Sequence, residues 1–200
     1  DSQLVIETIQ RLFQRCRIKN TQVATALSGH SVIVKRISLP VMSEAELAES
    51  IHWEAEHYIP FDIEDVNLDY QILEGSSLSG AGNMDVLLAA AKKDKISDYT
   101  SVVSQAGLTP VAVDIAAFAL QNAFEINYDQ DPDAVTALVN IGAQVVNINV
   151  LRNGIPAFTR DIMTGGAQYT EEIQKALSVS FEEAERIKMG GSPDDEGQVQ

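Results

Sequence analysis

The sequence is poor in the residues that mark several common functions. Its 200 residues include one cysteine, one tryptophan and three histidines. The lone cysteine, Cys16, excludes an internal disulfide and fits a reducing compartment. His52 and His57 stand five positions apart, a spacing that does not suit a zinc pair on one helix face. No Gly-x-Ser-x-Gly motif or Ser/His/Asp set is present, so the sequence predicts neither a metal site nor a hydrolase with a side-chain nucleophile.

Basic residues and long apolar runs are scarce as well. Fourteen Lys and Arg residues stand against 29 Asp and Glu residues, which gives a net charge of −15. Such a surface repels phosphate backbones and anionic lipid head groups, so nucleic acid is disfavoured as a partner. No apolar run approaches the ~20 residues that cross a bilayer, and the first residues do not resemble a signal peptide. We therefore expect no direct membrane insertion, and a membrane role would need a protein partner as intermediary.

Hydrophobic periodicity predicts a mixed α/β chain. The first two strands are predicted to form a hairpin through Ser28-Gly29-His30. Ser43 with Glu46 and Ser180 with Glu183 have the spacing of capping boxes, which open helices. The predicted helices cover 3–18, 43–59, 94–107, 115–126, 171–178 and 180–190, and the predicted strands cover 23–27, 31–37, 66–73, 84–91, 111–113, 137–140, 145–151 and 157–160.

Two local features have more than one interpretation. The glycine-bearing turns at 141–143 and 164–166 allow backbone N–H groups to approach a phosphate, although tight turns of this kind are usually only structural. Trp53 falls on the polar side of the helix predicted from Ser43, opposite its apolar residues. A tryptophan in that position either packs under another element of the chain or anchors a partner.

Five segments of the chain carry recognisable motifs. They are Ser28-Gly29-His30-Ser31-Val32-Ile33, Leu39-Pro40-Val41-Met42, Trp53-Glu54-Ala55-Glu56-His57-Tyr58-Ile59-Pro60-Phe61-Asp62, Val139-Asn140-Ile141-Gly142-Ala143 and Asn153-Gly154-Ile155-Pro156-Ala157-Phe158-Thr159-Arg160-Asp161-Ile162. In matching order, these motifs resemble those of the PilM family of type IV pilus proteins, which is similar to the cell-division protein FtsA. The likeness covers roughly residues 3–190.

This resemblance implies part of the actin-like ATPase fold, an α/β fold in which two large domains clamp a nucleotide. Residues 1–42 would belong to the first large domain (1A) and residues 43–115 to a small inserted subdomain (1C). Residues 116–134 would return to the large domains, residues 135–191 would open the second large domain, and 192–200 would form a disordered acidic tail. The family's first phosphate loop and its later glycine-rich adenosine loop are not found, so we expect a chain truncated at both ends.

The resemblance also implies ATP, with Mg²⁺, as a cofactor of the full-length protein. Its site residues here would be Gly142, Ala143, Gln144, Gly165, Gly166, Glu185 and Lys188. Gly142 to Gln144 would form the second phosphate hairpin, and Glu185 with Lys188 would face the ribose and base. The family usually has an acidic residue where this sequence has Asn140. Because an amide is a poor Mg²⁺ ligand, we expect weak nucleotide binding in this piece and little or no ATPase activity.

The implied function is a cytoplasmic scaffold held at the inner membrane through protein partners, above all the N-terminal tail of PilN. An extended tail would lie between the first large domain and the inserted subdomain. From position alone, its contacts would be Ile37, Leu39, Trp53, Tyr58 and Phe61. The alternatives are an actin-like ATPase, an FtsA-like filament protein and a GspL-like cytoplasmic domain of type II secretion. An open sheet edge would also favour a homo-oligomer.

Overall fold

A computed structural model describes residues 2–73, 82–129, 131 and 133–191 of the chain. The predicted tail at 192–200 lies outside these residues. The helices are α1 (Ser2–Arg15), α2 (Glu44–Glu56), the 3-10 turn η1 (Ile63–Asp65), α3 (Lys93–Gln105), α4 (Ala116–Asn127), α5 (Gly166–Leu177) and α6 (Phe181–Lys188). The strands are β1 (Gln22–Leu27), β2 (Val32–Pro40), β3 (Val66–Ile72), β4 (Asn83–Lys92), β5 (Thr109–Ile115), β6 (Val135–Ile141), β7 (Val146–Arg152) and β8 (Ile155–Ile162).

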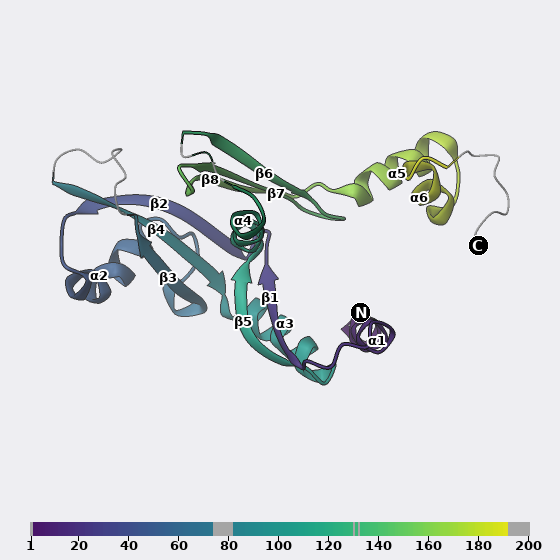
Figure 1. Cartoon of the computed structure of the whole chain (residues 1–200), viewed down its shortest axis with the longest axis horizontal. Coiled ribbons are helices and arrows are strands. Elements are labelled where there is room, and N and C mark those ends of the chain that lie inside the picture. Colours follow the sequence, from purple (N-terminus) through teal and green to yellow (C-terminus); the bar gives the residue numbers. More distant parts are fainter. Residues whose placement is uncertain (1, 74–81, 130, 132, 192–200) are drawn as a thin grey trace.

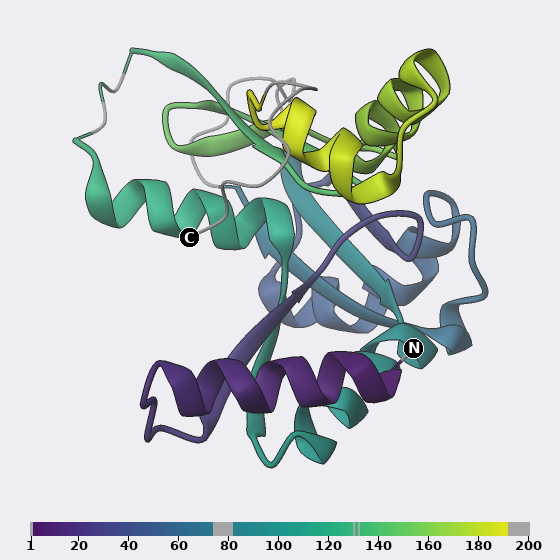
Figure 2. The same ribbon diagram turned by 90° about the vertical axis from the view of Figure 1, so that its right-hand side faces the viewer.

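The strands form three separate small sheets (Figure 1). One sheet has the order β2-β4-β3, the second is the pair β1-β5, and the third has the order β6-β7-β8. Helix α4 lies between the third sheet and the upper ends of β1 and β5, while α5 and α6 extend away from the sheets (Figure 1). The view turned by 90° shows α1 across the lower end of the β1-β5 pair, far from the third sheet (Figure 2).

An apolar core lies between α2 and one face of the β2-β4-β3 sheet. Alternate residues of the strands point to this face, as the period of two requires. Leu47, Ile51 and Ala55 of α2 pack on it with at most 2% of their surface exposed. The predicted capping box begins α2, since Ser43 accepts from the Glu46 backbone N–H and the Glu46 side chain accepts from the Ser43 N–H. The burial of Leu47, Ile51 and Ala55 therefore determines which side of α2 faces outward.

The predicted hairpin between the first two strands is wrong. β1 pairs in parallel with β5, whereas β2 pairs along its whole length with β4 in antiparallel orientation. Gly29, at φ +85°, turns the chain out of β1 into a different sheet. Strands that follow each other in sequence usually pair, but the long segment between β1 and β5 permits the parallel crossover that replaces the hairpin here.

The strand pairing does not follow the predicted division between residues 1–42 and 43–115. β2 precedes residue 43 yet shares a sheet with β3 and β4, and β5 lies inside 43–115 yet pairs with β1. β2, β3 and β4 thus form one sheet, and β5 pairs with β1 in another. The predicted division between residues 134 and 135 falls at the start of β6.

The β6-β7-β8 sheet packs on α4 through one face and is exposed on the other. Asn149 of β7 is fully buried, and its side-chain amide donates to Ala117 O of α4 at 3.3 Å and to the Gln121 carboxamide oxygen at 3.1 Å. On the opposite face, Val139 is 52% exposed and Phe158 is 51% exposed. This side of the sheet has no covering element among the described residues (Figure 1).

Candidate functional site

The turn between β6 and β7 is joined to the N-terminus of α5 by backbone hydrogen bonds. The turn is closed by Gly142 N–H, which donates to Val145 O at 3.0 Å. Gly166 N–H donates to Gly142 O at 2.9 Å, and Ala167 N–H donates to Ala143 O at 2.8 Å. The glycines predicted to share a site are therefore in contact.

Gly165 is the tightest point of this junction. A Cβ at this position would lie 2.5 Å from Gly142 O and 2.6 Å from Ala143 C, and both atoms belong to the backbone. Real Cβ atoms do not approach so closely, so the position requires glycine for steric reasons. At Gly166, by contrast, a Cβ would meet Lys188 Nζ at 3.5 Å and Gly142 O at 3.7 Å, which are ordinary contacts.

Glu185 and Lys188 of α6 are tied to the start of α5 through Thr170. Lys188 Nζ donates to Thr170 Oγ1 at 2.8 Å and to Gly166 O at 3.2 Å, and it forms an ion pair with Glu185. Thr170 donates to the Glu185 carboxylate and is fully buried. Two hydrogen bonds lower the pKa of the Glu185 carboxyl. The one from Lys188 has the larger effect and the one from Thr170 the smaller. Thr170 was not predicted from the sequence, although a threonine on the inner face of an amphipathic helix is a signal of a buried polar contact.

The backbone hydrogen bonds at this junction show which N–H groups are free to bind an anion. The N–H groups of Gly166, Ala167 and Gln168 all donate to backbone carbonyls, so the first turn of α5 is already capped. In the turn itself, the N–H groups of Ala143 and Gln144 donate to no backbone carbonyl of the described residues. Ala143 and Gln144 are exposed. An anion would therefore meet the turn rather than the helix end.

A polar network leads from this turn to the first half of the chain. Asn140 donates to the Asn147 side-chain oxygen at 3.1 Å, and Asn147 donates to Asp161 Oδ1 at 2.7 Å. The second oxygen of Asp161 accepts from Gly29 N–H, which lies between β1 and β2. A groove of ≈ 530 Å³ lies at this junction, and Phe61 contributes to its wall. Asp161 and Asn147 were not predicted, although polar residues in predicted strands indicate a specific partner.

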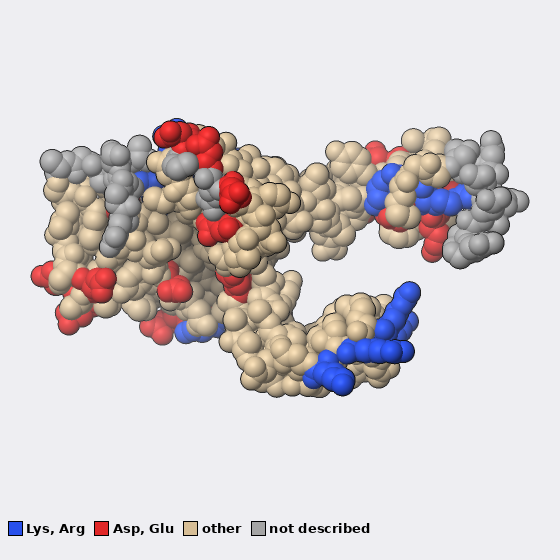
Figure 3. Space-filling view, viewed as in Figure 1, with Lys and Arg blue, Asp and Glu red and all other residues tan. Residues whose placement is uncertain are grey.

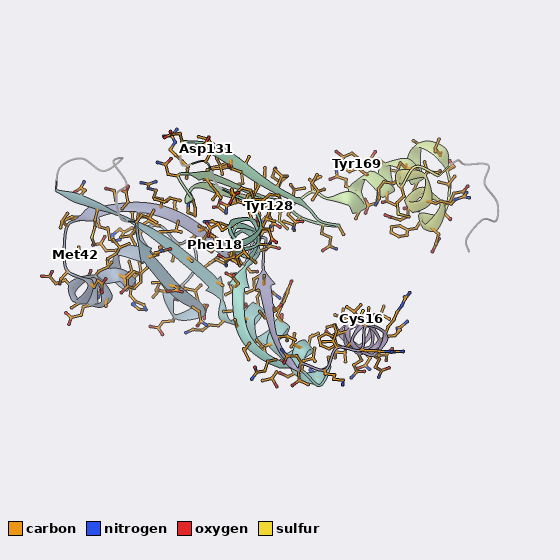
Figure 4. The ribbon with its side chains drawn as sticks, viewed as in Figure 1. Cys16, Met42, Phe118, Tyr128, Asp131 and Tyr169 are labelled. Carbon is orange, nitrogen blue, oxygen red and sulfur yellow. The ribbon has the colours of Figure 1, made fainter. Side chains whose placement is uncertain are left out.

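A second groove, of ≈ 490 Å³, lies between the β1-β5 pair and the β2-β4-β3 sheet. Its floor is the sheet face that looks away from α2, where Asn67 pairs with Ala91 and Asp69 pairs with Ala89. Its walls and remaining lining are Leu27, Leu68, Ala90, Ile96, Val113, Asp114, Ile115 and Phe118. Phe118 lies at the start of α4, beside this junction (Figure 4). Ala89 and Ala91 have small side chains that leave space above the sheet, so this groove can hold an extended chain.

The five residues predicted to bind a partner do not form one surface. Ile37 and Leu39 are only 3% and 2% exposed, because they belong to the core under α2. Tyr58 and Phe61 pack against the same core, and Phe61 also borders the first groove. Trp53 is 71% exposed on the outer side of α2, so it does not pack under another described element.

The described part of the chain shows neither a metal site nor a membrane-spanning helix. No three His, Cys, Asp or Glu side chains there are grouped as a metal site would require. None of the described helices is both long enough and apolar enough to cross a membrane.

Comparisons with known proteins agree with this architecture. The family model of the type IV pilus assembly protein PilM matches residues 1–198. A solved structure of a PilM-PilN type IV pilus biogenesis complex is similar over 93% of this chain, with 33% identity and a TM-score of 0.81. The cytoplasmic domain of EpsL, an inner-membrane component of the type II secretion system of Vibrio cholerae, is similar over 88% of this chain, with 14% identity and a TM-score of 0.51.

The chain spans 55% of the PilM-PilN match and 60% of the EpsL match. The predicted fold class, part of the actin-like ATPase fold, is confirmed. The EpsL likeness, at 14% identity, concerns the fold alone. With a family model over almost its whole length and a relative at 33% identity, this chain belongs to the PilM family of type IV pilus assembly proteins.

Proposed function

We propose that this chain is part of a cytoplasmic scaffold of the type IV pilus platform that holds the N-terminal tail of PilN. The observation that supports the proposal is the groove between the β1-β5 pair and the β2-β4-β3 sheet. It lies at the boundary where the family resemblance puts the tail. The similar structure is, by its own description, a complex of PilM with PilN.

The groove has the chemistry of a peptide site. Leu27, Val113 and Phe118 offer apolar contacts on one side, and Asn67 and Asp69 offer polar groups on the other. β3 is an edge strand, since the sheet order β2-β4-β3 leaves one of its sides without a strand partner among the described residues. An extended tail can donate and accept backbone hydrogen bonds along such an edge while its alternate side chains enter the groove. A tail held this way would keep the scaffold at the inner membrane without lipid contacts.

Filling the groove tests this site. Ala89 lies in its floor opposite Asp69, and Ala89→Leu adds three carbon atoms where the tail would lie. Ala157→Leu is the matched control, because Ala157 is exposed and it makes the same change on β8, a strand that does not line the groove. Titration calorimetry of each variant with a synthetic PilN tail should show binding weakened at least about tenfold by Ala89→Leu, or about 1.4 kcal/mol. Equal affinities for Ala89→Leu, Ala157→Leu and the unchanged chain would refute the groove.

We further propose that the turn Gly142–Gln144 contributes to a nucleotide phosphate site in the full-length protein. The N–H groups of Ala143 and Gln144 are available to a phosphate, while Glu185 and Lys188 lie beyond the N-terminus of α5. Asn140 has an amide in place of a carboxylate, and its NH2 group donates to Asn147 Oδ1, so this residue is a poor Mg²⁺ ligand. The site therefore fits binding of ATP better than its hydrolysis.

A steric change at the turn separates this second proposal from the first. Gly142→Val in the full-length protein would bring a Cβ to 2.9 Å from Val145 O and distort the turn. We expect binding of a fluorescent ATP analogue to be lost while the PilN tail binds with unchanged affinity. An unchanged affinity for the analogue would count against a phosphate site at this turn.

A further inference from the structure

The outer side of α2 carries an unusual combination of side chains. Glu46, Glu49, Trp53, Glu56 and His57 are spaced so that they form one stripe along the helix, here called the outer stripe. All five are exposed, and Trp53 has 71% of its surface in solvent. Trp53 is the only tryptophan of the chain.

The fold keeps this stripe outward. The opposite side of α2 carries Leu47, Ile51 and Ala55, which are buried in the apolar core. Rotating the helix to cover Trp53 would expose those three residues, so the packing of the core keeps Trp53 exposed. Figure 1 shows α2 on the outside of the β2-β4-β3 sheet, with no described element beyond it. An exposed indole on a rigid helix is the kind of anchor that dominates binding at protein interfaces.

The negative charge around Trp53 favours a positively charged partner. Residues 41–65 include eight Asp and Glu residues and no Lys or Arg, so this segment supplies more than half of the net charge of −15. In the space-filling view, acidic residues gather over the part of the molecule that contains α2, and Lys and Arg gather over α1 (Figure 3). A lysine or arginine can stack on an indole face, and carboxylates beside the ring add attraction for the same cation.

We propose that the outer stripe binds a Lys/Arg-rich segment of another protein, with one cation stacked on Trp53 and its neighbours paired with Glu49 and Glu56. This site is separate from the groove proposed for PilN, because α2 covers one face of the β2-β4-β3 sheet and the groove uses the other. The chain can therefore hold two partners at once. The proposal does not depend on the PilN assignment.

Because Trp53 is the only tryptophan, its fluorescence reports directly on this site. The probe is a synthetic eight-residue peptide of alternating Arg and Ala, and the comparison peptide replaces Arg by Glu. We expect a saturable change in Trp53 emission with the Arg peptide and none with the Glu peptide. Binding should weaken steeply with added salt, because exposed charges are screened. Emission that does not change at saturating Arg peptide would overturn the proposal.

Charge-matched variants separate a specific site from general attraction to an acidic protein. Glu49→Gln with Glu56→Gln removes two charges beside Trp53, and Glu171→Gln with Glu182→Gln removes two exposed charges from α5 and α6. We expect calorimetry with the Arg peptide to show about fivefold to tenfold weaker binding for the first pair. The second pair should leave binding within about twofold.

A third variant tests the aromatic contact itself. Trp53→Ala should weaken binding of the Arg peptide at least about fivefold, whereas Tyr99→Ala, on the exposed side of α3, should not. Equal losses in the two double variants, or no loss in Trp53→Ala, would show that only overall charge matters. Concentration-dependent sedimentation of the unchanged chain that disappears in Trp53→Ala would assign the stripe to a second copy of this chain instead.

Discussion

Gly165→Ala is the substitution whose effect the structure fixes most closely. The new Cβ would lie 2.5 Å from Gly142 O and 2.6 Å from Ala143 C, and neither backbone atom can move without breaking the hydrogen bonds that join the turn to α5. Inserting a methyl group into a packed site costs about 1–3 kcal/mol, and a contact with two backbone atoms belongs at the upper end of that range. We therefore expect a loss of about 3 kcal/mol in the free energy of unfolding.

Gly166→Ala provides the matched control one residue later. Its Cβ would make only ordinary contacts, with Lys188 Nζ at 3.5 Å and Gly142 O at 3.7 Å. Replacing a helical glycine by alanine without strain usually stabilises a protein by about 0.4–1 kcal/mol. Urea unfolding of both variants, followed by far-ultraviolet circular dichroism, should thus give changes of opposite sign. If Gly165→Ala were as stable as the unchanged chain, the close junction of turn and helix would be refuted.

Two further predictions concern Asp161 and Glu185. Asp161→Ala removes the acceptor of Gly29 N–H, so we expect amide hydrogen exchange at Gly29 to quicken and stability to fall by about 2 kcal/mol. Unchanged protection of that amide would contradict the link. Lys188 and Thr170 hold the pKa of Glu185 below its ordinary value of 4.5, so their stabilisation is fully present above that value and is lost as the pH falls through the lowered pKa. Urea midpoints from pH 7 to pH 3 should show the unchanged chain losing this advantage over Glu185→Gln at the acidic end, and parallel curves would argue against the contact.

Local sequence signals predicted the elements well because they depend on short-range chemistry. The Ser43–Glu46 capping box and the apolar spacing of 47, 51 and 55 define the start and the buried side of α2, and both appear in the structure. The same spacing put Trp53 on the outer side, where it is exposed. What the outer stripe binds does not follow from periodicity, since that depends on a molecule outside the chain.

Long-range pairing could not be read from the same signals. β1 and β2 were predicted to pair with each other because they are consecutive in sequence, yet β1 pairs with β5 and β2 with β4, both far along the chain. The start of α5 was predicted at residue 171 rather than at Gly166, because glycine is a poor helix former. The carbonyls of Gly142 and Ala143 cap those first residues from another element, a contact that no local pattern reveals.

The predicted site residues also fall into two groups, those that lie together in the structure and those that are buried in its core. Gly142 and Ala143 meet Gly165 and Gly166 because β6 and β8, on the two sides of β7, end at the same edge of the sheet, and the family resemblance implied this proximity. Ile37 and Leu39 were chosen by position alone, and the sheet buries both in its core. The groove behind that sheet depends on two alanines, Ala89 and Ala91, and small residues leave little trace in a hydrophobic pattern.

The most direct test of the scaffold assignment is a hydrogen-exchange footprint of a synthetic PilN tail on this chain. We expect slower exchange along β3 at residues 67–69 and along β5 at residues 113–115, which border the groove. Exchange in α2 should not change, because α2 lies on the other face of the sheet. Protection confined to α2, or a chain with no protected segment at saturating tail, would show that the tail does not bind in this groove.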